Sequence, residues 1–227
     1  MKQWFARRYL DILGSIYIYN EHRGYTALDR VLEAVRAKHP EARELIASVE
    51  KHRADERKHY CMFKRWFELR GTMPIELDRV FGHIDRFIEI TFGCTIDSLD
   101  TEAIIASDEL FERLCRVISL TEKRGLKQVE ILLEHPIVRQ DKALHRIFEV
   151  VHVDEPDHFL PYDKWLADNA RRMPNWRERA IDRVIHSELL FIKLPLLFLW
   201  FGAPRRIAWH DAGEDNPRPV PKGLAAA

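Results

Sequence analysis

The chain has 227 residues, 46% of them hydrophobic and 32% charged, which is enough apolar sequence to bury the core of one large soluble domain. Its 36 lysine and arginine residues balance its 36 aspartate and glutamate residues, so it lacks the basic excess that marks nucleic-acid binders. The three cysteines are far apart and form no Cys-x-x-Cys pair. This argues against a disulfide framework, a zinc ribbon or a rubredoxin-type iron site, and it predicts a reducing, cytoplasmic location.

Apolar residues recur with the period of an α-helix along most of the chain. The pattern predicts a first helix over residues 9–38, ended by a His-Pro pair, and a second over residues 40–70, ended before a glycine. A shorter amphipathic helix is expected over residues 75–90, and residues 92–98 are expected to form a loop.

A third long helix is expected to begin at Thr101 or Ser107 and to end at Pro136, and a fourth is expected over residues 138–168. A fifth begins near Pro174 and contains an apolar run over residues 189–201. Four prolines then punctuate a segment without periodicity. We therefore expect a helical domain over 1–202, with halves at about 9–70 and 101–168 and a C-terminal helix at about 174–202, and an irregular proline-rich tail over 203–227.

The two halves resemble each other. Residues 20–24 (NEHRG) match residues 121–125 (TEKRG), and residues 55–60 (DERKHY) match residues 154–159 (DEPDHF). A tryptophan follows the second block at the same distance in both halves. Each half is thus predicted to form one helical hairpin, and two hairpins make an all-α four-helix bundle with a crossover helix and a fifth, C-terminal helix.

Each half carries a glutamate on its first helix and a Glu-x-x-His motif on its second. Glu21 lies about 18 residues, or ~27 Å, before the first turn, and Glu56 lies about 16 residues, or ~24 Å, after it. In the second half, the corresponding lengths for Glu122 and Glu155 are ~21 Å and ~24 Å. The carboxylates should therefore return to one level of the bundle, with each histidine on the same face as the glutamate three residues before it.

These positions lie on helix faces that are otherwise apolar, where an unpaired carboxylate is costly. Four carboxylates carry a charge of −4, which two divalent metal ions would balance, and two neutral imidazoles would complete the donors. The pattern therefore predicts a buried dinuclear metal site.

The arrangement resembles the ferritin-like di-iron carboxylate proteins, over roughly residues 9–168. The resemblance implies two iron ions, with manganese or a mixed pair as alternatives, and it implies Glu56 and Glu155 as bridging carboxylates. It further implies that Asp55 and Asp154 each orient a histidine of the opposite hairpin. The implied ligands are Glu21, Glu56 and His59 for one metal, and Glu122, Glu155 and His158 for the other.

Three features extend or question this pattern. His52 and His152 are expected on the metal-facing stripe, as extra ligands or as groups that support the ligands. Pro156 lies inside the second Glu-x-x-His motif, and it predicts either an irregular helix or a kink that opens one metal to O2 or substrate. Arg23 and Arg124 are expected to be structural ion-pair partners.

The resemblance implies an oxidoreductase that activates O2 and hydroxylates or oxygenates a small organic substrate, with electrons from an external donor. Two alternatives remain open: iron or peroxide handling of the ferritin or rubrerythrin type, and a metal-free helical interaction module. The apolar run over residues 189–201 is expected to cap the bundle or form a homodimer interface, and contact with a membrane surface is the less favoured alternative. If it lines the mouth of the bundle, it would guide a hydrophobic substrate.

Overall fold

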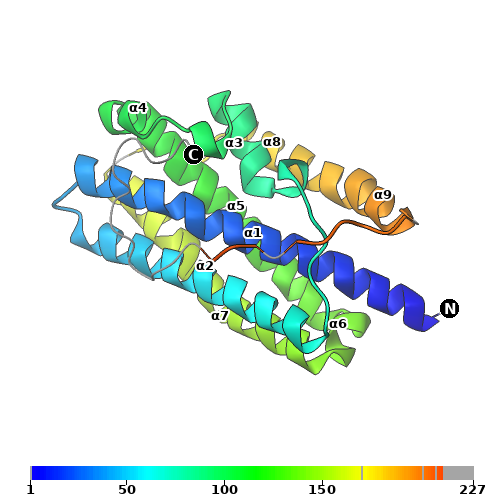
Figure 1. Ribbon diagram of the computed structural model, residues 1–227. Coiled ribbons are helices and arrows are strands. Elements are labelled where there is room, and N and C mark those ends of the chain that lie inside the picture. The colour runs from blue at the N-terminus through cyan, green and yellow to red at the C-terminus, as the bar shows by residue number, and fades with distance from the viewer. Residues whose placement is uncertain (1, 170, 201, 208, 212–227) are drawn as a thin grey trace.

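The computed structural model describes residues 2–169, 171–200, 202–207 and 209–211, and every regular element of these ranges is helical, apart from one isolated bridge. The prediction of an all-α fold is confirmed. Helix α1 packs against α2, α5 against α7, and α2 against α7, so the two hairpins lie side by side (Figure 1). The four long helices are α1 (Lys2–Lys38), α2 (Arg43–Leu69), α5 (Asp108–Glu134) and α7 (Lys142–Asp168).

Local capping residues divide the predicted helices of the second half. The side chain of Ser107 accepts a hydrogen bond from the Leu110 amide and separates α4 (Thr101–Ala106) from α5, so both predicted starts are used. Similarly, Asp141 caps α7 through the Leu144 amide and separates it from α6 (Pro136–Gln140).

The expectation of a helix over residues 75–90 is wrong in its first part. Ile75 and Leu77 are both buried, which fits the two-residue period of extended chain, and the backbone there pairs with the C-terminal segment. The amide of Glu76 donates to the Arg205 carbonyl at 2.8 Å. A 3-10 turn, η1 (Arg79–Phe81), precedes α3 (His83–Phe92), and a second, η2 (Ile96–Ser98), lies in the predicted loop.

The C-terminal helix begins at a capping box between Asn175 and Glu178 and is continuous through three elements. A π-helical turn in its middle is a feature that often marks functional sites. The elements are α8 (Trp176–Glu188), the π-helical η3 (Leu189–Lys193) and α9 (Leu194–Leu199). Figure 1 shows α3, α8 and α9 on one side of α1 and α5, with α2 and α7 on the other.

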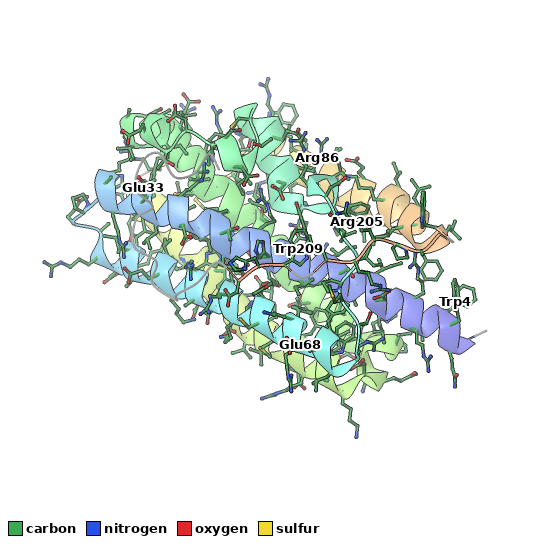
Figure 2. All side chains as sticks on the ribbon, in the orientation of Figure 1. Trp4, Glu33, Glu68, Arg86, Arg205 and Trp209 are labelled. Carbon is green, nitrogen blue, oxygen red and sulfur yellow. The ribbon has the colours of Figure 1, made fainter. Side chains whose placement is uncertain are left out.

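The segment after α9 is irregular, as expected, but its described part packs on the bundle. The Tyr60 hydroxyl donates to the Trp209 carbonyl, and Trp209 lies over α1 in Figure 2. Residue 201 of the predicted apolar run and residues 212–227 of the predicted tail lie outside the described residues. In the part of the chain that the structure describes, no helix has both the length and the apolar character needed to cross a membrane.

Candidate metal centre

The predicted ligands lie midway along the bundle, between two apolar clusters. One cluster surrounds Val35, Val49 and Trp165 near the first turn, and the other surrounds Phe63, Phe148 and Leu144 near the second. Glu21, Glu56 and Glu155 are buried, His59 and His158 are fully buried, and the Glu122 side chain is 18% exposed. The bundle therefore holds four carboxylates and two imidazoles at one level in an apolar interior.

The first group of donors comprises Glu21, Glu56 and His59, whose donor atoms lie within 4.8 Å of one another. Nδ1 of His59 lies 3.3 Å from Oε2 of Glu21 and 4.0 Å from Oε1 of Glu56. On the other side of the ring, Nε2 lies 2.9 Å from Oδ2 of Asp154, on the opposite hairpin. In a neutral His59 ring that donates from Nε2 to an ionised Asp154, the lone pair lies at Nδ1, on the side of the glutamates.

The second group comprises His52, Glu56, Glu122 and His158, so Glu56 belongs to both groups. Nδ1 of His158 lies 3.3 Å from Oε1 of Glu56, and Nε2 of His52 lies 3.8 Å from a carboxylate oxygen of both Glu56 and Glu122. The rings of His52 and His158 stack with their centroids 4.1 Å apart. Glu56 is thus placed where a bridging carboxylate would be expected.

Glu155 is placed less centrally than predicted. Its Oε2 lies 3.9 Å from Nδ1 of His158, outside the compact second group, where His52 takes its place. Asp55 lies 3.6 Å from Nε2 of His158 and is held by two lysines, Lys51 and Lys58. Both aspartates thus face a histidine of the opposite hairpin, while the bridging and orienting roles stay predictions.

The expectation that His152 lies on the metal-facing stripe is wrong. Its side chain is 40% exposed, and its nearest charged partner is Glu130, at 4.0 Å. At 100° per residue, His152 and His158 lie 60° to either side of Glu155 and therefore point to different sides of α7. His52 is buried, with Nδ1 3.4 Å from the Tyr162 hydroxyl and Nε2 facing the glutamates.

Pro156 does not interrupt its helix, so the expected irregular helix is absent, while the expected kink stays a prediction. Helix α7 is continuous through Pro156 and Pro161, and Glu155 and His158 keep their helical spacing on one buried face. Proline at these positions leaves the preceding carbonyls without their usual donor but does not break the helix.

Two glycines belong to the site and were not singled out from the sequence. A Cβ atom at Gly24 would overlap Oε2 of Glu56, and one at Gly125 would lie 3.2 Å from Oε1 of Glu155. Each glycine thus leaves room for the carboxylate of the facing helix. The signal was present in the repeat, because both halves contain Glu-x-x-Gly, at Glu21 and at Glu122.

Five of the buried donor atoms that face the centre of the site lack hydrogen-bond partners. In proteins, buried polar atoms are almost always satisfied, so such a group of unpaired donors calls for an additional binding partner. Carboxylate oxygens and imidazole nitrogens suit iron or manganese, and the residues present fit two such ions. The unpaired atoms are Glu21 Oε2, His52 Nε2, His59 Nδ1, Glu155 Oε2 and His158 Nδ1.

The electrostatics of the site also favour cation binding. Burial and the neighbouring Glu56 raise the pKa of Glu122 to about 8. Burial and Glu122 raise the pKa of Glu155 well above its usual value. Burial alone would lower the pKa of His59, but Asp154 and Glu21 raise it to about 9. The crowded carboxylates thus take up positive charge readily, either as protons or as metal ions.

A cavity of about 130 Å³ reaches the carboxylates from the side of α1, α3 and α5. Its wall includes Glu21, Glu56, Glu122 and Glu155, and most of the remaining wall is apolar. On either side, the two arginines of the repeat form ion pairs, as expected: Arg23 with Asp85 and Asp97 of the crossover, and Arg124 with Asp182 of α8.

Comparisons with known proteins add no assignment: no family model, curated protein or solved structure matches this chain.

Proposed function

We propose that the chain is a dinuclear metal oxidoreductase of the ferritin-like di-iron carboxylate type that uses O2 to hydroxylate or oxygenate an organic substrate. The observation that carries the proposal is the buried carboxylate of Glu56, shared by two groups of donors in which one glutamate and three histidines each have a buried atom without a hydrogen-bond partner. Such an arrangement is costly without bound cations and fits two of them.

The residues of the chain have distinct tasks in this proposal. Glu21 and His59 hold one ion, Glu122 and His158 hold the other, Glu56 contacts both, and Glu155 lies at the edge. Asp154 accepts from Nε2 of His59, so that the ring, once it gives up its second proton, would present the Nδ1 lone pair to the ion. His52 is a further donor toward Glu56 and Glu122. Two ferrous ions, or an iron and manganese pair, supply the capacity to reduce O2 when bound.

An organic substrate is favoured over simple iron oxidation by the cavity beside the carboxylates. Its apolar wall, from Ile84 and Ile88 of α3 and Leu114 and Ile118 of α5, suits a hydrophobic group rather than hydrated iron. Hydroxylation of a C–H bond balances as substrate, O2, two electrons and two protons giving the alcohol and water. The electrons come from a separate reductase, the external partner of this reaction.

The proposal is tested by metal content after anaerobic loading with ferrous ion, for the wild type and for the double variant Glu56→Ala/Glu155→Ala. Glu130→Ala is the matched control, since Glu130 is a half-exposed glutamate of α5 outside the site. We expect about two ions per chain in the wild type and the control and fewer than one in the double variant. Circular dichroism checks that each variant folds.

Reduced, loaded protein should then consume O2, and the double variant should not. A wild type that binds no metal under these conditions would contradict the proposed function. Rapid oxidation of many ferrous ions per chain would instead support the ferritin-type alternative.

A further inference from the structure

A second, larger cavity of about 570 Å³ lies beside the carboxylate cavity, between α1, α5 and the η3–α9 segment. We call it the apolar groove. Apolar side chains from three elements form most of its wall, so the groove suits a hydrocarbon group. They include Ile12 and Leu13 of α1, Leu132 of α5, and Leu190, Leu194 and Phe198 of the C-terminal helix.

The apolar groove and the carboxylate cavity share part of their walls: Ile16, Tyr17, Gln128 and Leu189 line both. Along α1 the combined lining runs from Tyr9 past Glu21 to Val31, and the twelve residues from Tyr9 to Glu21 span ~18 Å. The two spaces therefore adjoin, and together they form an elongated, mostly apolar path from the groove to the carboxylates.

Three polar groups of the groove wall lie at its junction with the carboxylate cavity. Gln128 and His186 form a hydrogen bond of 2.9 Å there, and the Tyr17 hydroxyl is buried without a hydrogen-bond partner. The π-helical turn η3 places Leu189 at this same junction. The path thus changes from apolar to polar close to the carboxylates, which is the order that a long apolar molecule with one reacting end requires.

An exposed apolar patch, which we call the crest, adjoins the outer end of the groove. Its residues are 44–77% exposed: Trp4 and Phe5 of α1, and Phe191, Ile192, Leu196, Leu199 and Trp200 of the C-terminal helix. The rings of Trp4 and Phe5 contact Phe198, a residue of the groove wall, at 6.2 and 5.7 Å between centroids. Figure 2 shows Trp4 at the N-terminal end of α1.

Patches of this kind mark interaction surfaces. Two exposed tryptophans among leucine and phenylalanine, with the exposed Arg7 on the same end of α1, have the composition of a segment that lies in a membrane interface.

We propose that the apolar groove holds the hydrocarbon chain of a lipid substrate, which enters from a membrane surface on which the crest rests. This names the substrate class of the proposed oxidoreductase and so rests on that function. The groove, its mouth and its junction with the carboxylates then form one route from the bilayer to the site.

Chain binding is tested first on metal-free, full-length protein, by calorimetry with octanoic, dodecanoic and hexadecanoic acids. We expect affinity to rise by about fourfold for each methylene until the groove is filled. Leu190→Asp and Ile131→Asp, from opposite walls, should each weaken hexadecanoic acid binding about tenfold or more. Leu160→Asp is the matched control, an exposed leucine of α7 outside the groove, and should bind as the wild type does.

Membrane docking is tested by flotation with phosphatidylcholine vesicles that contain phosphatidylglycerol. Wild type and Trp176→Ala should float with the vesicles, because Trp176 is an exposed tryptophan remote from the crest. Trp200→Ala combined with Phe191→Ala should reduce the bound fraction about tenfold or more. Equal binding by crest and control variants would overturn the proposal, as would a dimer that buries the crest and dissociates in the double variant.

The experiments can refute the lipid-substrate proposal and the oxidoreductase proposal independently of each other. Metal binding without chain binding would overturn the lipid substrate and leave the dinuclear site intact. Chain binding that is insensitive to Leu190→Asp and Ile131→Asp would also overturn it. Chain and vesicle binding by a protein that takes up no metal would contradict the oxidoreductase and leave the groove as a lipid-binding site.

Discussion

The two halves of the site share a pattern but not an environment. In the first half, His59 is held by a hydrogen bond of 2.9 Å to Asp154. In the second, His158 lies 3.6 Å from Asp55, which Lys51 and Lys58 contact at 2.6 Å, and Lys58 also contacts Asp154 at 2.8 Å. His52 faces the second group, yet the repeat-equivalent position on α7 is Val151, so this third imidazole has no counterpart. The repeat places the donors, and the residues that differ between the halves make the two positions unequal.

Substitution of the two glycines, Gly24 and Gly125, should reveal the largest difference in metal affinity between the halves. Gly24→Ala would force the Glu56 carboxylate, shared by both groups, out of place, whereas Gly125→Ala would press only lightly on Glu155. We expect Gly24→Ala to weaken ferrous binding about a hundredfold and Gly125→Ala much less. Anaerobic titration measures both. Equal losses of ferrous affinity in the two variants would show that both halves contribute equally to metal binding.

Substitution of the two aspartates that face the histidines, Asp154 and Asp55, should reveal the next largest difference in metal affinity. Asp154→Asn removes the acceptor that fixes the ring of His59, and we expect a loss of metal affinity of about thirtyfold. Asp55→Asn should cost less, because its closest contacts are to Lys51 and Lys58. The dissociation constants of the two ions are measured in both variants. A greater loss of affinity in Asp55→Asn than in Asp154→Asn would contradict this expectation.

His52 offers a direct test of the asymmetry. His52→Val installs the residue of the equivalent position on α7, and it should weaken the second metal position about tenfold while leaving the first unchanged. His152→Val is the control, because that side chain points away from the site. Mössbauer spectra of the loaded protein should show two iron environments in the wild type that become more alike in His52→Val.

The smallest expected effect is on the stability of the protein in acid, and it comes from His83, which lies beside the second half of the site. Burial and Arg124 lower the pKa of His83, which contacts Asp182, to about 3. The unfolded chain, with a pKa near 6.5, therefore binds more protons at this residue, and stability falls as the pH drops below that value.

We expect His83 to contribute about 1 kcal/mol to the loss of unfolding free energy over the first pH unit below 6.5. Urea unfolding of metal-free wild type and His83→Gln across this range measures the difference. A slope against pH that His83→Gln leaves unchanged would contradict this assignment.

The repeat allowed much of the architecture to be predicted, because the helical periods and the return of Glu21 and Glu56 to one level depend on local geometry. The extended pairing of Ile75 with the C-terminal segment was missed, since it depends on contacts between residues distant in sequence. His152 was misplaced because proximity to Glu155 in sequence was given more weight than its angle around the helix. Comparison of His52 with Val151 within the repeat would have indicated that only one such histidine faces the site.

The central claim is that two metal ions bind between the halves and share Glu56. The most direct test is the anomalous difference map of crystals loaded anaerobically with ferrous ion. We expect two iron peaks, one beside Nδ1 of His59 and one beside Nδ1 of His158, both within reach of the Glu56 carboxylate. Absence of iron at these atoms in loaded crystals, or iron bound only at exposed carboxylates, would contradict it.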